Sequence, residues 1–134
     1  MLSEAGLIGV WRLISNLNVD EDGTTSEGPL GPHPKGLLIY GGHGYMSVSM
    51  MRTGHVSGAG SGPERPATTY MGYSGTWRLV DGVVVHEVEV SSHRHMMNTK
   101  QIREAVLDED RLTLYSIAHI NGQPQRRVLR WQRA

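Results

Sequence analysis

The side chains best suited to chemistry gather around one predicted strand, residues 83–90, which reads Val-Val-Val-His-Glu-Val-Glu-Val. Its β-branched residues and period-two alternation put Val84, His86, Val88 and Val90 on one face. His86 therefore lies on the apolar side of the strand. A histidine there is either a packed core residue with one satisfied nitrogen or the polar anchor of a ligand cavity. A histidine that titrates near neutral pH can also transfer a proton.

A second candidate group is Arg103, in the strand predicted over residues 99–107. The sequence leaves open which face of this strand turns inward, so Arg103 has two interpretations. On the outside it would form a cross-strand ion pair. On the inside it would need an anionic partner, which Glu87, Glu89 or a carboxylate or enolate of a ligand could supply.

The tyrosines offer further hydrogen-bonding groups. Tyr40, Tyr45, Tyr73 and Tyr115 lie in predicted strands. Each is either a core residue with a satisfied hydroxyl or a hydrogen-bond donor to a ligand. Of these, Tyr45 and Tyr73 are the favoured ligand contacts.

Several other kinds of site are disfavoured. His93 and His95 would share one side of an extended segment and could in principle bind zinc or copper, but methionine and asparagine follow them. No metal site and no cofactor are therefore predicted. The glycines at 58, 60 and 62 are not followed by the Gly-Lys-Ser/Thr of a phosphate loop. A Gly-x-Ser-x-Gly elbow is also lacking, which disfavours a hydrolase.

Composition narrows the class of protein. A chain of 134 residues fits one domain, residues 1–134. Its 13 basic and 13 acidic side chains give no long-range attraction for nucleic acid or an anionic membrane. Without cysteine it has no disulfide, thiolate metal site or cysteine nucleophile. Residues 1–6 lack the features of a signal peptide, and no apolar run approaches the roughly 20 residues that span a bilayer. A soluble, cytoplasmic protein is expected.

Eight predicted strands must position these groups: residues 7–15, 35–40, 45–52, 70–80, 83–90, 99–107, 111–119 and 125–133. Residues 53–69 are rich in glycine and proline and form an irregular connection, of the kind that often serves as a lid. Beyond one turn at residues 3–7, little helix is expected. Such strands hide their edges by closing into an all-β, antiparallel, up-and-down barrel. The interior of a barrel of this size holds side chains or one small ligand.

Motifs along nearly the whole chain together resemble the lipocalin-like domain family. They are Gly9-x-Trp11-Arg12-Leu13, Pro34-x-Gly36-x-Leu38-Ile39-Tyr40, Gly44-Tyr45-Met46-Ser47, Tyr73-Ser74-Gly75-Thr76-Trp77, Val85-His86-x-Val88-Glu89-x-Ser91, Arg103, Asp110-Arg111-Leu112-Thr113-Leu114 and Leu129-x-Trp131-x-Arg133. The resemblance implies a calycin-type β-barrel with a ligand cavity and no particular reaction. It places His86, Arg103 and the corner at residues 73–75 in or near that cavity. It also implies that Arg130 or Arg133 stacks over Trp11 at the floor.

Two functions follow. The first is binding of a small apolar or amphipathic molecule by Tyr40, Tyr45, Met46, Val48, Met50, Val84, Val88 and Tyr115. The alternative is a cofactor-free cyclase or isomerase of a polyketide- or terpenoid-like natural-product intermediate, by analogy with other small barrels. There His86 would act as acid or base, and Arg103 or Tyr73 would steady an enolate. The expected partner is a small hydrophobic ligand or substrate, and a homodimer remains open.

Overall fold

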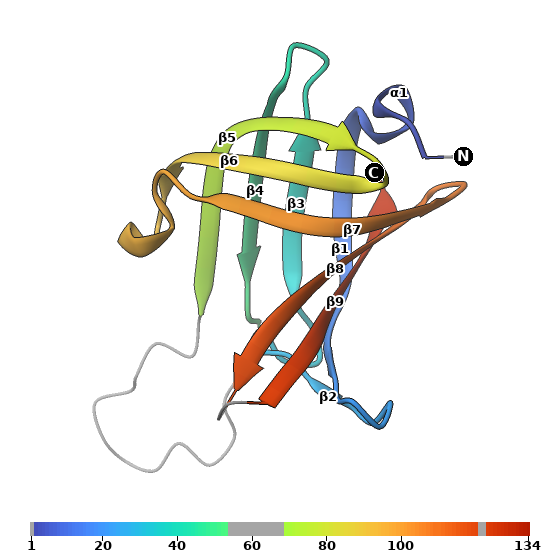
Figure 1. Cartoon of the computed structure of the whole chain (residues 1–134), viewed down its shortest axis with the longest axis vertical. Coiled ribbons are helices and arrows are strands. Elements are labelled where there is room, and N and C mark those ends of the chain that lie inside the picture. Colours follow the sequence, from blue (N-terminus) through green and yellow to red (C-terminus); the bar gives the residue numbers. More distant parts are fainter. Residues whose placement is uncertain (1, 54–68, 121–122) are drawn as a thin grey trace.

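The computed structural model describes residues 2–53, 69–120 and 123–134, with the backbone alone at residues 118–120 and 123 (Figure 1). The connection expected over residues 53–69 lies almost wholly outside the described residues, as do residues 121 and 122. The elements are α1 (Glu4–Leu7), β1 (Gly9–Val19), β2 (Thr25–Glu27), β3 (Lys35–Tyr40), β4 (Tyr45–Met51), β5 (Tyr70–Val80), β6 (Val83–Ser91), the 3-10 turn η1 (Arg94–Met96), β7 (Lys100–Asp108), β8 (Arg111–Ile120) and β9 (Gln123–Arg133).

The strands close into a barrel. Their order is β1-β3-β4-β5-β6-β7-β8-β9, every neighbouring pair is antiparallel, and β9 pairs back with β1. This closure runs from Trp11 opposite Arg133 to Val19 opposite Arg126. The short β2 pairs only with the far end of β1, from residue 17 to residue 19. The predicted eight-stranded up-and-down barrel with little helix is confirmed.

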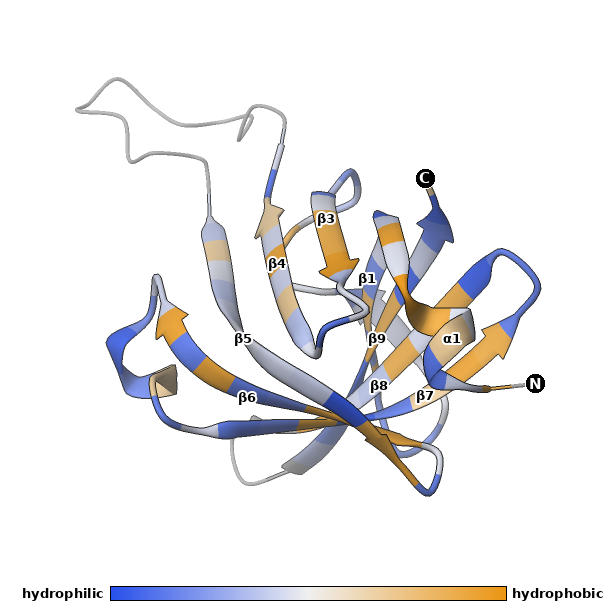
Figure 2. Cartoon of the chain, turned by 90° about the horizontal axis from the view of Figure 1, so that it is seen from above, coloured by the Kyte–Doolittle hydropathy of each residue, from blue (hydrophilic) through white to orange (hydrophobic). Residues whose placement is uncertain are grey.

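Alternation along each strand decides what faces the interior. In β4, for example, Met46, Val48 and Met50 are buried, whereas Tyr45 before them is 55% exposed. Figure 2 shows the matching alternation of hydrophobic and hydrophilic residues along several strands. The inward residues form one hydrophobic core, and the cavity described below interrupts that core on one side.

A β-bulge corrects one prediction about β6. Val84, His86 and Val88 face inward as predicted, but Val90 does not, since it is 60% exposed. The register shifts here, because Gly75 lies opposite Val88 while Ser74 lies opposite Val90, which leaves Glu89 as the extra residue. The bulge requires glycine at residue 75, where a Cβ atom would lie 1.8 Å from the backbone oxygen of Glu87.

One end of the barrel is closed by α1 and a tryptophan. The Ser3 hydroxyl accepts a hydrogen bond from the backbone N–H of Gly6 at 3.1 Å and so caps this short helix. Trp11 is fully buried beneath it, and its Nε1–H donates to the Leu7 carbonyl at 2.9 Å. The single helical turn therefore supplies the partner that a buried indole needs.

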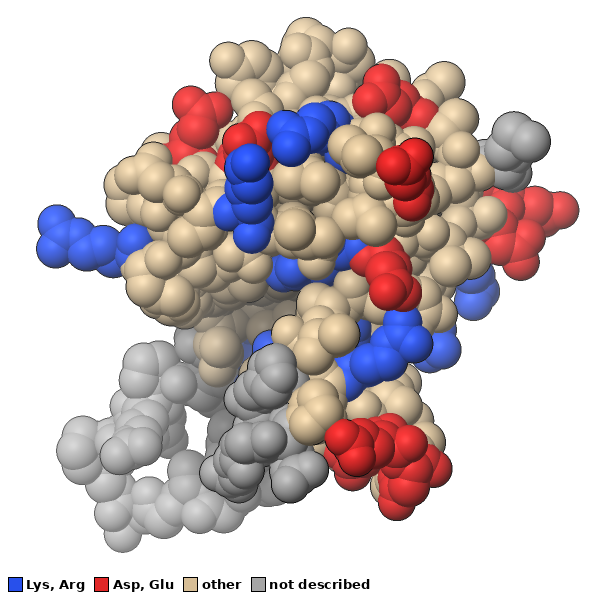
Figure 3. Space-filling model, viewed as in Figure 1, with Lys and Arg blue, Asp and Glu red and all other residues tan. Residues whose placement is uncertain are grey.

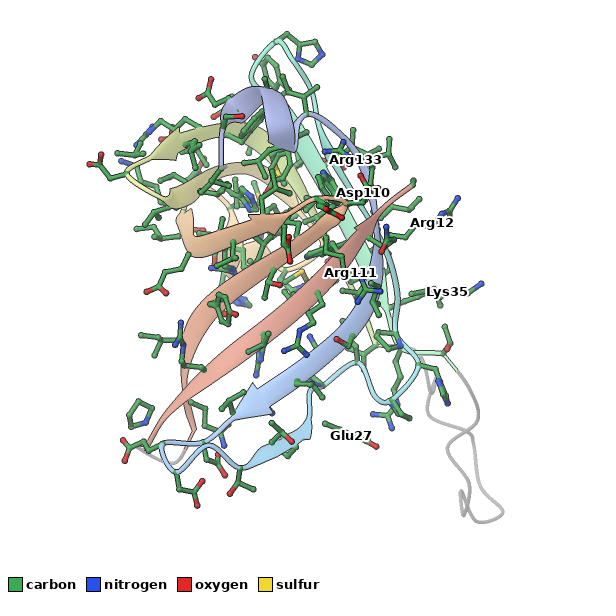
Figure 4. All side chains as sticks on the ribbon, turned by 90° about the vertical axis from the view of Figure 1, so that its right-hand side faces the viewer. Arg12, Glu27, Lys35, Asp110, Arg111 and Arg133 are labelled. Carbon is green, nitrogen blue, oxygen red and sulfur yellow. The ribbon has the colours of Figure 1, made fainter. Side chains whose placement is uncertain are left out.

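Arg133 completes this end. Its guanidinium stacks 4.2 Å from the centre of the Trp11 ring and donates to the carbonyls of Gly6 and Ile8 at 2.5 and 3.1 Å. The Asp110 carboxylate lies 3.7 Å away, and Figure 4 shows the two labelled side chains together at this end. Of the two arginines that the resemblance allowed, Arg133 is thus the one over Trp11.

The outer surface carries mixed charge. Acidic and basic side chains are interspersed on the face drawn in Figure 3. Within the described residues, no helix has the length and apolar character needed to cross a membrane.

Candidate functional site

The barrel encloses a cavity of about 270 Å³ on the side away from Trp11. Its apolar walls come from Pro29, Leu30, Leu38, Val48, Met50, Met71, Leu114 and Leu129, and its polar groups from Asn16, Thr69, Tyr73, His86, His93, Arg103, Ser116, Arg127 and Trp131. Most of these are inward positions of strands, whereas Pro29 and Leu30 come from the loop after β2. Apolar walls with a few convergent polar groups are typical of small-molecule sites.

His86 forms the centre of a buried hydrogen-bonded triad on one wall. Its Nδ1 lies 2.6 Å from the Tyr73 hydroxyl and its Nε2 lies 2.6 Å from the Tyr40 hydroxyl. All three side chains are at most 5% exposed. Only His86 and Tyr73 line the cavity, so Tyr40 lies behind the histidine.

Burial keeps the triad neutral. Burial first, and then the nearby Arg103 cation, lower the pKa of His86 to about 3. Burial also raises the pKa of Tyr73 to about 12 and that of Tyr40 well above its usual value. A neutral imidazole donates at one nitrogen and accepts at the other, so one tyrosine donates to His86 and the other accepts from it. The premise that His86 titrates near neutral pH is therefore wrong.

Two arginines line the same cavity, and neither has an acidic partner among the described residues. The Arg103 guanidinium donates to Gln101 Oε1 at 3.2 Å and to the carbonyl of Ile102 at 3.0 Å. The Nε–H of Arg127 donates to Asn18 Oδ1 at 3.2 Å. All of these acceptors are neutral.

The ion pairs of the described chain lie elsewhere. They join Arg78 to Glu87, Arg126 to Glu104 and Arg133 to Asp110. Glu87, one of the partners considered for Arg103, is thus on the outside with Arg78. Burial, and then repulsion from Arg103, lowers the pKa of Arg127, as expected when two cations lie close together.

Two further polar atoms of the lining lack partners among the described residues. They are Asn16 Oδ1 and Trp131 Nε1, in side chains that are 4% and 1% exposed. Asn16 fits its place because residue 28 is glycine, since a Cβ atom there would lie 1.3 Å from Oδ1. Buried polar atoms without a partner are uncommon and call for a bound molecule or water.

A wider hollow of about 520 Å³ adjoins the cavity at its mouth. The two spaces share Met71, His93, Arg103, Ser116 and Arg127, and the outer one adds His95, Met96, Thr99, Gln101 and Ile117. The segment around η1 therefore forms one rim, and both arginines lie between the cavity and the hollow. Figure 3 shows cationic side chains in a recess beneath β7.

The structure brings together part of the predicted site. His86, Arg103 and Tyr73 all line the cavity, as do Val48 and Met50. Met46, Val84 and Val88 belong to the buried core but do not line the cavity, and Tyr40 contacts it only through His86. Of the two interpretations of Arg103, the inward one is correct. Its side chain lines the cavity on the same face of β7 as the buried Ala105, whereas the neighbouring Ile102 is 58% exposed.

Two of the predicted tyrosine contacts are not brought to the cavity. Tyr45 is exposed on the outer face of β4, in a shallow hollow beside His43, and their rings are 5.7 Å apart. Tyr115 lies on the face of β8 opposite to the inward Leu114, and Arg126 stacks 4.6 Å from its ring centre. In a strand, neighbouring residues point to opposite faces, so Tyr45 and Met46 could not both face inward.

The predicted site lacked several residues that line the cavity, among them Asn16, Leu30, Ser116, Arg127 and Trp131. Period-two alternation could have found Arg127, which lies two residues before the inward Leu129, and Ser116, which lies two residues after Leu114. It could not have found Asn16, because the pairing register of β1 with β9 shifts between residues 13 and 15 and reverses the phase. The proline-rich loop around Leu30 has no periodicity to follow.

A family model described as a lipocalin-like domain matches residues 8–134. No curated protein and no solved structure matches the chain.

Proposed function

The chain belongs to the lipocalin-like domain family, and from this premise we propose that it binds one small apolar or amphipathic molecule in the barrel cavity. The observation that carries the proposal is the cavity of about 270 Å³, whose apolar walls surround a few polar groups. At about 30 Å³ for each water-sized group, this space suits a molecule on the order of ten non-hydrogen atoms.

The polar wall supports a bound molecule that is not purely hydrocarbon. Arg103 and Arg127 line the cavity, and Asn16 Oδ1 has no partner among the described residues. A ligand with a hydrogen-bonding end would satisfy groups that a hydrocarbon would leave unpaired, which costs free energy. The apolar end would lie against Val48, Met50 and Leu114.

The same wall suits binding better than the cofactor-free cyclase or isomerase. That reaction needs a group that exchanges a proton near neutral pH. Both ring nitrogens of His86 are engaged by tyrosines, and its pKa is lowered to about 3 by burial and by Arg103. The histidine is therefore suited to orienting Tyr73 rather than to carrying protons.

The test compares two adjacent methionines on opposite faces of β4. 1-Octanol, with nine non-hydrogen atoms, is titrated into the protein and followed by calorimetry. We expect saturable binding of one molecule, and Met50→Trp should weaken it at least about tenfold because the indole fills the cavity. The control Met51→Trp changes the outer face and should leave the affinity within about twofold.

Native mass spectrometry of the protein purified from its producer complements this test, because a retained organic molecule would identify the ligand. The proposal fails if neither 1-octanol nor its carboxylate counterpart octanoate binds, or if Met51→Trp weakens binding as much as Met50→Trp does. A thermal melt of each variant checks that it is folded.

A further inference from the structure

The inner face of β7, β8 and β9 carries a row of donors at the mouth of the cavity. Ser116 lies directly opposite Arg127. Arg103 lies one residue beyond the Glu104–Tyr115 pair, which brings it beside Ser116 on the other flank. Because neighbouring strands are about 4.8 Å apart, the two arginine backbones are about 10 Å apart with the serine between them. Two guanidinium groups and one hydroxyl thus line the same mouth.

No acidic side chain of the described residues neutralises this row. Arg103 and Arg127 are both half-buried, and their hydrogen-bond acceptors are a glutamine, an asparagine and a backbone carbonyl. Two cations that are partly removed from water and line the same space are unfavourable without an anion beside them. This arrangement is expected of a site that binds a negatively charged group of a ligand.

The residues deeper in the barrel indicate what kind of molecule would carry the anionic group. Next to the Ser116–Arg127 pair on the inner face comes the pair Leu114–Leu129, and then Leu112–Trp131. The inner face therefore changes from cationic at the mouth to apolar toward the floor. A free inorganic ion would leave this apolar space unfilled.

Resting on the proposed function, we propose that the ligand is a small organic carboxylate whose head group is held between Arg103 and Arg127, with its apolar body against Leu114 and Leu129. The planar guanidinium fork matches the two oxygens of a carboxylate. The Ser116 hydroxyl between the arginines can donate to the same group.

Octanoate tests this inference, because it has ten non-hydrogen atoms and differs from 1-octanol mainly in its charge. By calorimetry, octanoate should bind the unmodified protein at least about tenfold more tightly than 1-octanol. Arg127→Gln should remove that advantage, so that octanoate and 1-octanol bind the variant with similar affinities. Arg103→Gln should act in the same way, and a thermal melt of each variant verifies folding.

Arg130→Gln is the matched control, since Arg130 is an exposed residue of the same strand and its replacement changes the net charge equally. It should leave octanoate affinity within about twofold. Arg127→Lys keeps the charge but loses the planar fork, so an intermediate affinity is expected.

The outcomes separate the two proposals. If 1-octanol binds and octanoate gains nothing, the carboxylate inference is wrong and the binding function stands. If Arg130→Gln weakens octanoate binding as much as Arg127→Gln, general charge attraction explains the preference and the inference is again wrong. If inorganic phosphate alone binds as tightly as octanoate, the row is an inorganic anion site. If neither organic probe binds, the proposed function fails together with the inference.

Discussion

The two ends of the barrel use arginine in opposite ways. At the closed end, Arg133 stacks on Trp11, donates to two backbone carbonyls and has Asp110 at 3.7 Å. At the mouth, Arg103 and Arg127 have only neutral acceptors within the part of the chain that the structure describes, and repulsion from Arg103 lowers the pKa of Arg127. The same side chain therefore stabilises the fold at one end and is left uncompensated at the other.

This difference separates stability from binding within one small barrel. A cation with a full set of partners increases the free energy of unfolding. A half-buried cation without an anionic partner decreases it until a ligand supplies the anion. Functional sites commonly hold such unfavourable groups, and the rest of the fold must compensate for them. The closed end, with its buried indole, is the part that can compensate.

The largest effect is expected from removing the indole of the closed end. Trp11→Ala should lower the free energy of unfolding by about 3–5 kcal/mol, because it leaves a cavity under α1 and removes the surface on which Arg133 stacks. Met50→Ala, beside the ligand cavity, should cost toward the lower end of the roughly 2–5 kcal/mol typical of buried methionine. Urea denaturation measures both. A larger loss for Met50→Ala would place the stabilising region at the mouth instead.

The buried triad offers the next test, through pH. The pKa of His86 is lowered from 6.5 to about 3 in the folded protein, first by burial and then by Arg103. As the pH falls below 6.5, the unfolded chain takes up a proton that the folded protein does not. The free energy of unfolding should therefore lose about 1.4 kcal/mol per pH unit from this residue, down to pH ~3.

His86→Gln isolates that contribution, since the other titrating groups remain. Urea denaturation between pH 7 and pH 4 should give a shallower fall in stability for the variant than for the unmodified protein. Parallel pH profiles would mean that His86 is protonated in the folded state and that the triad is more open to water than its burial indicates.

The smallest effects on the free energy of unfolding are expected from replacing the arginines at the two ends. Arg133→Gln should lower the free energy of unfolding by about 1–2 kcal/mol, because it removes the cation over Trp11 and the hydrogen bonds to two carbonyls. Without ligand, Arg127→Gln should leave stability unchanged or raise it by up to about 1 kcal/mol, because repulsion from Arg103 is relieved. Thermal melts at low salt measure the difference. A loss of stability in Arg127→Gln equal to that in Arg133→Gln would remove the contrast between the two ends.

The barrel was predictable because its strands repeat a simple pattern. Val84, His86 and Val88 are spaced two residues apart, and this period places them inward wherever the pairing is regular. The same rule predicts the inward face of β4 once Tyr45 is excluded, because Met46, Val48 and Met50 share one phase. The resemblance to the lipocalin-like family added the pairing of Trp11 with a C-terminal arginine, which alternation alone cannot supply.

Other features of the interior, including the place of Asn16 in the candidate site, depend on departures from that pattern. The bulge between β5 and β6 turns Val90 outward, and the irregularity in β1 brings Asn16 inward. Both depend on long-range pairing, so no local signal marks them. The face of Arg103 was undecided for a related reason, because Ile102 and Val106 on the outside are as apolar as inward residues usually are. A rule that turns every apolar residue inward would have buried Ile102 and Val106. It would therefore have predicted, wrongly, that Arg103 lies on the outside.

The pairing of β1 with β9, the seam that closes the barrel, also affects the rate of folding. It joins residues from opposite ends of the described chain, as in the hydrogen bond from Arg133 to the Ile8 carbonyl across 125 positions. Contacts of such separation slow folding, into the range of roughly milliseconds to seconds for barrels of this kind. Until β9 arrives, β1 presents a free edge over the length that β9 later covers, and free edges promote association with other chains. Slow closure of this seam is therefore the step at which aggregation would compete with folding.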